Sequence, residues 1–85
     1  MQYDFNKNAI VYSQSGCQAC VEAKDLLEQL GYVVEVRTLG VEGNATKKQL
    51  MQDFPDARSI PQIILNNHKI GTLPTLKKFL KIQWK

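Results

Sequence analysis

Two cysteines, Cys17 and Cys20, stand three residues apart and are the side chains of this chain best suited to chemistry. They stand at the start of a helical pattern that continues to Leu30. A cysteine in the first turn of a helix meets unpaired N–H groups and the positive end of the helix dipole, which both favour the reactive thiolate. A partner at i+3 lies on the same helix face and can attack a mixed disulfide on the first sulfur. The spacing therefore predicts thiol–disulfide chemistry, with Cys17 attacking and Cys20 resolving.

Two other uses of a cysteine pair stay open, an inert structural bridge and a metal site. A bridge that closes so short a loop removes little chain entropy, which disfavours a purely structural role. A closed zinc site needs four ligands, and beyond the two thiols the chain offers one histidine, His68. Acidic residues or a second chain would have to complete such a site. We therefore expect no bound metal.

Length and composition limit what can surround the pair. The 85 residues are expected to form a single domain, 1–85, with one modest core and no separate substrate domain. The apolar runs are far shorter than a membrane span, and Met1–Asp4 shows no leader pattern, so a cytoplasmic protein without membrane contact is expected. The net charge of +3 comes from scattered lysines, densest in the last helix, where they suit the helix dipole. We expect no nucleic-acid partner.

Hydrophobic periodicity predicts elements in the order β-α-β-α-β-β-α. The first strand is apolar without alternation, as in a central strand covered on both faces, whereas the second carries charges at alternate positions, as at a sheet edge. This order predicts an α/β fold in which a four-stranded mixed sheet is flanked by three helices, with one parallel half and one hairpin half. The strands are expected at 9–13, 32–37, 62–65 and 68–70. The first helix is expected to run from the cysteine pair to Leu30, and the other two helices at 46–54 and 72–84.

Local signals predict where these elements begin and end. Gly31 stands where a helix commonly ends in the left-handed conformation. Residues 39–44 include two glycines and are expected to form a loop. Thr46 and Gln49 have the spacing of a capping box at the start of the second helix. Asn66-Asn67 tolerates positive φ and predicts a tight turn between the last two strands.

With these features in place, the chain resembles the glutaredoxins, the minimal form of the thioredoxin fold, from about Ile10 to Leu80. Three motifs together carry the resemblance. The cysteine pair follows the first strand, Ser59-Ile60-Pro61 stands in the place of the family's Thr-Val-Pro, and Gly71-Thr72 precedes the last helix where the family usually has Gly-Gly. A single Cys-x-x-Cys is a weak signal, whereas this combination is specific.

The resemblance implies a glutathione-dependent dithiol oxidoreductase that reduces protein or mixed disulfides, with glutathione as co-substrate. It implies that Pro61 is cis and faces the cysteines, and that the backbone of Ile60 pairs with the cysteinyl part of glutathione. Ser59, Gly71 and Thr72 would lie around the same ligand. The expected partners are glutathione and disulfide-containing proteins, with ribonucleotide reductase among the candidates, and the protein is expected to be a monomer.

Four residues depart from the family pattern and concern the substrate more than the fold. Gln18-Ala19 replaces the usual Pro-Tyr, Gln14 replaces a lysine that pairs with a glutathione carboxylate, and Thr75 replaces an aspartate that binds the γ-glutamyl end. The two charge-assisted contacts are therefore lost. An alternative is a glutaredoxin-like redoxin that is recharged by thioredoxin reductase and donates electrons to ribonucleotide reductase. A dimer that shares an iron–sulfur cluster through Cys17 and glutathione is a further alternative.

Overall fold

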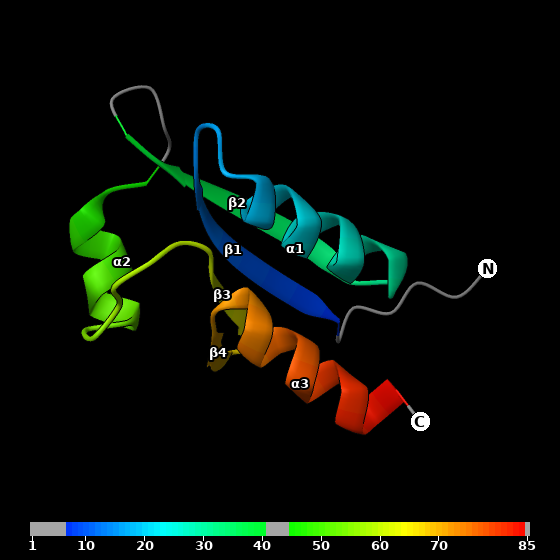
Figure 1. Ribbon diagram of the computed structural model, residues 1–85. Helices are drawn as coiled ribbons and strands as arrows, with labels where there is room; N and C mark the ends of the chain where they lie inside the picture. Colours follow the sequence, from blue (N-terminus) through cyan, green and yellow to red (C-terminus); the bar gives the residue numbers. More distant parts are fainter. Residues whose placement is uncertain (1–6, 41–44, 85) are drawn as a thin grey trace.

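A four-stranded mixed sheet lies at the centre of the molecule (Figure 1), in a computed structural model that describes residues 7–40 and 45–84. The strand order β2-β1-β3-β4 makes β1 central and β2 an edge strand, as predicted. β2 runs parallel to β1, whereas β3 runs antiparallel to β1 and to β4. The predicted α/β fold is therefore confirmed. The strands are β1 (Asn8–Gln14), β2 (Val33–Leu39), β3 (Gln62–Leu65) and β4 (His68–Gly71).

Three helices cover the two faces of the sheet. α1 (Gln18–Gln29) and α3 (Leu73–Trp84) pack on one face, where their apolar sides and those of β1 and β3 form one core cluster. α2 (Lys47–Asp53) lies apart from them in Figure 1 and contributes to a second cluster on the opposite face. Within the described ranges, no helix is both long enough and apolar enough to span a membrane. The side chain of Trp84, expected on the apolar face of the last helix, lies outside the described part.

Short-range signals account for the element ends. The Thr46 hydroxyl accepts the N–H of Gln49 at 3.1 Å while the Gln49 side chain accepts the N–H of Thr46 at 2.9 Å, so the predicted capping box is present. Gly31 has φ +91°, and Asn66 and Asn67 have φ +49° and +70°, which confirms the helix end and the tight turn. Each of these features depends on residues close together in the chain.

The predicted end of β2 is wrong, and the error arises from pairing with a neighbouring strand. β2 begins at Val33 and extends to Leu39, beyond the expected end at Arg37 and into the expected loop, because Leu39 is the register partner of Gln14 in the parallel pair. Leu39 also forms an isolated bridge with Ala45. The remainder of the predicted loop, 41–44, lies outside the described residues. α1 begins at Gln18 with Cys17 at its N-cap, as expected from the position of the cysteine pair at the start of the helical pattern.

Candidate active site

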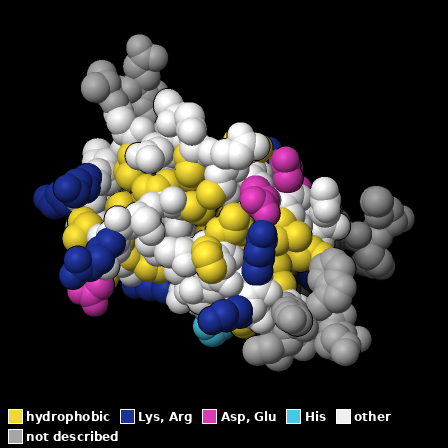
Figure 2. All heavy atoms as spheres, in the orientation of Figure 1, with side chains coloured by type: hydrophobic (Ala, Val, Ile, Leu, Met, Phe, Trp, Pro, Cys, Tyr) yellow, Lys and Arg dark blue, Asp and Glu magenta, His cyan; other side chains and the backbone are white. Residues whose placement is uncertain are grey.

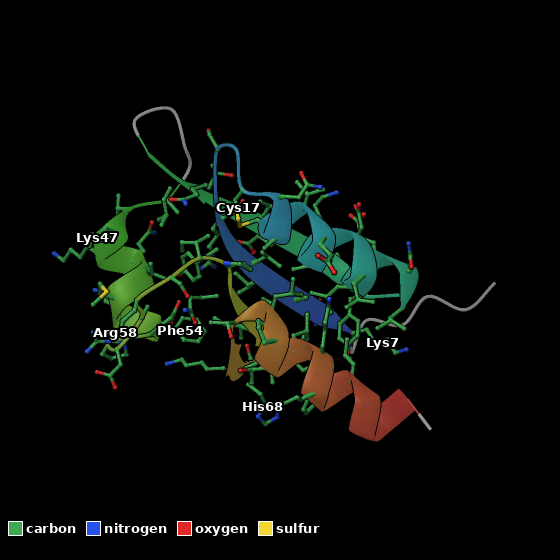
Figure 3. All side chains as sticks on the ribbon, viewed as in Figure 1. Lys7, Cys17, Lys47, Phe54, Arg58 and His68 are labelled. Carbon is green, nitrogen blue, oxygen red and sulfur yellow. A yellow bond between two sulfur atoms is a disulfide. The ribbon has the colours of Figure 1, made fainter. Side chains whose placement is uncertain are left out.

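Cys17 and Cys20 form a disulfide where the chain passes from β1 into α1 (Figure 3). Gly16, with φ +74°, makes the turn that carries Cys17 to the N-cap position of α1. There the Sγ atom of Cys17 accepts the backbone N–H of Cys20 at 3.1 Å. After reduction the same N–H and the helix dipole face the sulfur and stabilise negative charge on it. Cys17 is partly exposed, whereas Cys20 is only 3% exposed.

A hollow of about 780 Å³ lies next to this end of β1, between α2 and the segment that leads into β3. Its lining includes Gln14, Ser59 and Ile60, so the structure brings together three of the predicted substrate-binding residues. Most of the remaining lining is apolar, and Lys47 and Arg58 add two positive charges. Among the described lining residues there is no carboxylate side chain. We call this hollow the α2 groove.

The cations of the α2 groove extend outward at its rim. Figure 3 shows Lys47 on α2 and Arg58 on the following segment, both directed away from the body of the molecule on the same side. Figure 2 shows Lys and Arg side chains gathered on this side of the surface, next to a stretch of exposed hydrophobic side chains. The arrangement suits a small ligand that carries both apolar atoms and a carboxylate.

The other predicted site residues occupy different places. The peptide bond between Ile60 and Pro61 is cis, as the resemblance implies, and Pro61 is buried. Gly71 ends β4, and Thr72 directly precedes α3, in whose first turn the Thr75 hydroxyl lies 3.4 Å from that of Thr72. None of these last three residues lines the α2 groove. Their roles in binding stay predictions.

α2 contributes side chains to the site, although no residue of the second helix is among the site residues expected from the sequence. Thr46, Lys47, Leu50 and Met51 all line the α2 groove. A partial signal was available, because Leu50 and Met51 belong to the apolar side of the predicted second helix. That pattern predicts that this side of the helix packs against the protein. It does not reveal that a hollow remains between the helix and the segment before β3.

A second feature that no sequence motif indicates is a polar cluster under the C-terminal end of α2, formed by Tyr12, Arg37 and Asp53. The Tyr12 hydroxyl donates to Oδ2 of Asp53 at 2.6 Å and accepts from Nη1 of Arg37 at 2.9 Å. Burial raises the pKa of Tyr12, and the hydrogen bond to Asp53 raises it further, while Arg37 opposes both effects. The pKa of Arg37 is raised first by its hydrogen bond to Glu35 and then by its hydrogen bond to Tyr12. Tyr12 therefore stays protonated, and its hydroxyl donates the hydrogen bond to Asp53.

No three His, Cys, Asp or Glu side chains converge as metal ligands anywhere within residues 7–40 and 45–84. The chemistry that the described side chains themselves offer is that of the cysteine pair.

Comparison with known proteins identifies the family. A sequence model of the family Glutaredoxin matches residues 9–70. Glutaredoxin-C6 from Oryza sativa subsp. japonica is 33% identical over 63 residues, which cover 73% of this chain. The chain belongs to the glutaredoxin family. It spans 56% of the length of the rice glutaredoxin, so the match concerns part of that protein.

Solved glutaredoxin structures agree with this assignment. Reduced glutaredoxin from Escherichia coli superposes with a TM-score of 0.76 at 26% identity, covering 91% of this chain and 96% of that one. A buckwheat glutaredoxin, in a complex with glutathione, shares the fold with a TM-score of 0.73 at 22% identity, covering 91% of this chain and 71% of that one. The resemblance inferred from the motifs is thus confirmed.

The unequal burial of the two sulfurs leads to a first prediction. In the reduced protein, iodoacetamide at mild pH should label Cys17 on the order of tenfold faster than Cys20, because Cys17 is more exposed and receives the N–H of Cys20. Peptide mass spectrometry of samples quenched at successive times measures both rates. In the control, the protein unfolded in urea should lose the difference. Faster labelling of Cys20 in the folded protein would reverse the assignment of the attacking thiol.

Proposed function

We propose that this chain is a glutathione-dependent dithiol–disulfide oxidoreductase that reduces protein or mixed disulfides in the cytoplasm. The observation that carries the proposal is the position of Cys17, partly exposed at the N-cap of α1 with the N–H of Cys20 directed at its sulfur. Cytoplasmic thiols are kept reduced by glutathione and thioredoxin systems, which suits a protein that must regenerate a dithiol. Both sulfurs and the α2 groove come from one chain, so the proposal requires only a monomer.

The proposed reaction moves two electrons in two thiol–disulfide exchanges. The Cys17 thiolate attacks one sulfur of the substrate disulfide, forms a mixed disulfide and releases the other sulfur as a thiolate. Cys20 then attacks the Cys17 sulfur, which releases the second substrate thiol and leaves the Cys17–Cys20 disulfide. Two glutathione molecules reduce this disulfide and leave as glutathione disulfide. A mixed disulfide with glutathione can instead be resolved by a second glutathione, without Cys20.

The α2 groove supports glutathione as the reductant. Glutathione is a tripeptide with two carboxylates, and the groove combines the exposed segment at Ser59 with the cations Lys47 and Arg58. These cations compensate in part for Gln14, which stands where the family often has a lysine. The buckwheat glutaredoxin of the same fold binds glutathione, which agrees with this choice.

The choice of reductant is tested by two assays run in parallel on the same disulfide substrate. One supplies glutathione with glutathione reductase, and the other supplies thioredoxin reductase, each with NADPH consumption as the readout. We expect turnover with glutathione. Turnover with thioredoxin reductase and none with glutathione would refute the proposal. It would favour the alternative, a glutaredoxin-like redoxin that donates electrons to ribonucleotide reductase.

A second prediction concerns the two positions that lack the charges common in the family. Gln14→Lys combined with Thr75→Asp should lower the KM for glutathione by roughly two- to thirty-fold, because exposed ionic contacts contribute about 0.2–1 kcal/mol each. The measurement is the glutathione dependence of turnover at a fixed disulfide concentration. Thr75 lies in the first turn of α3, where an aspartate also suits the helix dipole, so the stability of the variant should not fall.

The matched control places the same two charges at exposed positions that are neither in the α2 groove nor at the start of α3. Gln29→Lys combined with Asn66→Asp adds one cation at the end of α1 and one anion in the turn between β3 and β4. This control should leave the KM unchanged. If the test variant also leaves the KM unchanged, Gln14 and Thr75 do not belong to the glutathione site.

A further inference from the structure

Two members of the polar cluster, Tyr12 and Arg37, lie in one row across the sheet, and the third, Asp53, reaches them from α2. Tyr12 of β1 is the register partner of Arg37 in β2 and of Gln62 in β3. Tyr12 has no exposed surface, yet its hydroxyl is satisfied from both sides, by Arg37 as donor and Asp53 as acceptor. The guanidinium of Arg37 also lies 5.5 Å from the centre of the Tyr12 ring. A fully paired polar row of this kind holds its members in one arrangement.

Asp53 connects this row to α2, because it is the last residue of that helix. Besides the hydrogen bond from Tyr12, its carboxylate lies 3.8 Å from Nη1 of Arg37 and 4.0 Å from Nζ of Lys69. Of the seven described residues of α2, Leu50 alone is buried. Apolar burial within α2 is therefore concentrated near its middle. At its C-terminal end, the C-cap residue Phe54 packs edge-to-face on the Tyr12 ring at 6.4 Å between ring centres, and the polar cluster adds hydrogen bonds and ion pairs.

The same row of the sheet also holds the segment before β3, which forms the side of the α2 groove opposite α2. Nε2 of Gln62 donates to the backbone carbonyl of Ser59 at 2.9 Å, and Ser59 lines the groove. Lys47, Leu50 and Met51 of α2 line the other side. The width of the groove thus depends on two attachments to the same sheet row, one through Tyr12 and one through Gln62.

We propose that Tyr12, Arg37 and Asp53 are positioning residues that fix α2 and thereby set the affinity of the α2 groove for the thiol co-substrate. None of the three lines the groove, and none makes a hydrogen bond or ion pair with Cys17 or Cys20 among the described contacts, so they act through α2. The inference rests on the proposed function for the identity of the co-substrate. It adds that this affinity is controlled from beneath the helix, by residues that do not touch the ligand.

The test removes one hydroxyl. Tyr12→Phe should raise the KM for glutathione about two- to tenfold and leave kcat unchanged, because the docked position of α2 is less populated while the saturated complex reacts as before. Amide hydrogen exchange in α2 should become about tenfold faster. Asp53→Asn keeps an oxygen that accepts from Tyr12 but loses the attraction of Arg37 and Lys69, so its effects should have the same direction and be smaller.

The matched control is Tyr32→Phe. Tyr32 packs against the core cluster on the other face of the sheet, and its hydroxyl makes no hydrogen bond to the described part of the chain. This variant should change neither the KM nor the exchange of α2. It also measures the effect of losing a tyrosine hydroxyl as such.

The outcomes separate the inference from the proposed function. If wild-type protein turns over with glutathione and Tyr12→Phe has an unchanged KM, or a lowered kcat with the KM unchanged, the positioning role is overturned. If amide hydrogen exchange in Tyr12→Phe is accelerated over wild type by the same factor in the sheet and in α2, the substitution destabilises the whole fold. Asp53→Asn must then raise the KM for the inference to stand. If wild-type protein does not turn over with glutathione, the proposed function and the affinity part of the inference are both refuted. In that case, faster amide exchange confined to α2 in Tyr12→Phe would support only the part of the inference that concerns how α2 is held on the sheet.

Discussion

Serine in place of Cys17 should abolish thiol transfer from every reductant, which is the largest effect expected of any single substitution in this protein. The serine hydroxyl cannot form the mixed disulfide through which both exchange steps pass. The geometry is retained, because serine is a favourable N-cap residue and its oxygen can still accept the N–H of Cys20. The loss would therefore report chemistry and not misfolding, and the coupled NADPH assay measures it directly.

Cys20→Ser is the matched control for this experiment. It removes the second sulfur and leaves Cys17 able to form a mixed disulfide. We expect it to abolish reduction that requires an internal disulfide and to spare turnover of glutathione mixed disulfides, which a second glutathione can resolve. If Cys17→Ser keeps activity while Cys20→Ser loses it, the two roles are exchanged.

Alanine in place of Leu27 should lower the free energy of unfolding by about 2–5 kcal/mol. Leu27 has no exposed surface and lies in the core cluster beneath α1, in contact with the layer that includes Val11 and Ile63. A small domain has a total stability of about 5–15 kcal/mol, so this one cavity removes a large share of it. Denaturant unfolding followed by circular dichroism measures the change, with both proteins in the oxidised form.

Val21→Ala provides a comparison on the same helix. Val21 is 52% exposed, so truncating it leaves no cavity and should change the free energy of unfolding by less than about 0.5 kcal/mol. Similar losses in Leu27→Ala and Val21→Ala would contradict the assignment of the core face of α1.

Much of the fold could be predicted because its signals are local and agree with one another. The apolar run of β1 indicates a strand covered on both faces, and the alternating charges near the end of β2 indicate an edge, and the sheet order has both features. The capping box at Thr46 and the turn at Asn66-Asn67 follow from side chains and backbone within a few residues. Cys17 and Cys20 lie together for the same reason, since their spacing is that of one helical turn.

The end of β2 could not be predicted from local sequence. Leu39 follows a threonine and precedes a glycine, which resembles the start of a loop. Its place in β2 is decided by pairing with Gln14, which belongs to a strand far earlier in the chain. Here the pairing with β1 continues as far as Gln14, and the sequence of β2 does not show where its neighbour ends.

The sequence by itself determined the cysteine pair, the order of the elements and the family to which the chain belongs, because each is written in short-range spacing or in motifs that can be compared directly. Only the tertiary structure decided which residues share the α2 groove, since its walls come from β1, α2 and the segment before β3. It also decided the partner of the Tyr12 hydroxyl. Tyr12 reads as one apolar residue of a buried strand, and the carboxylate that it binds lies 41 residues further along the chain. Hydrogen bonds of that range depend on how the layers pack, which no local pattern records.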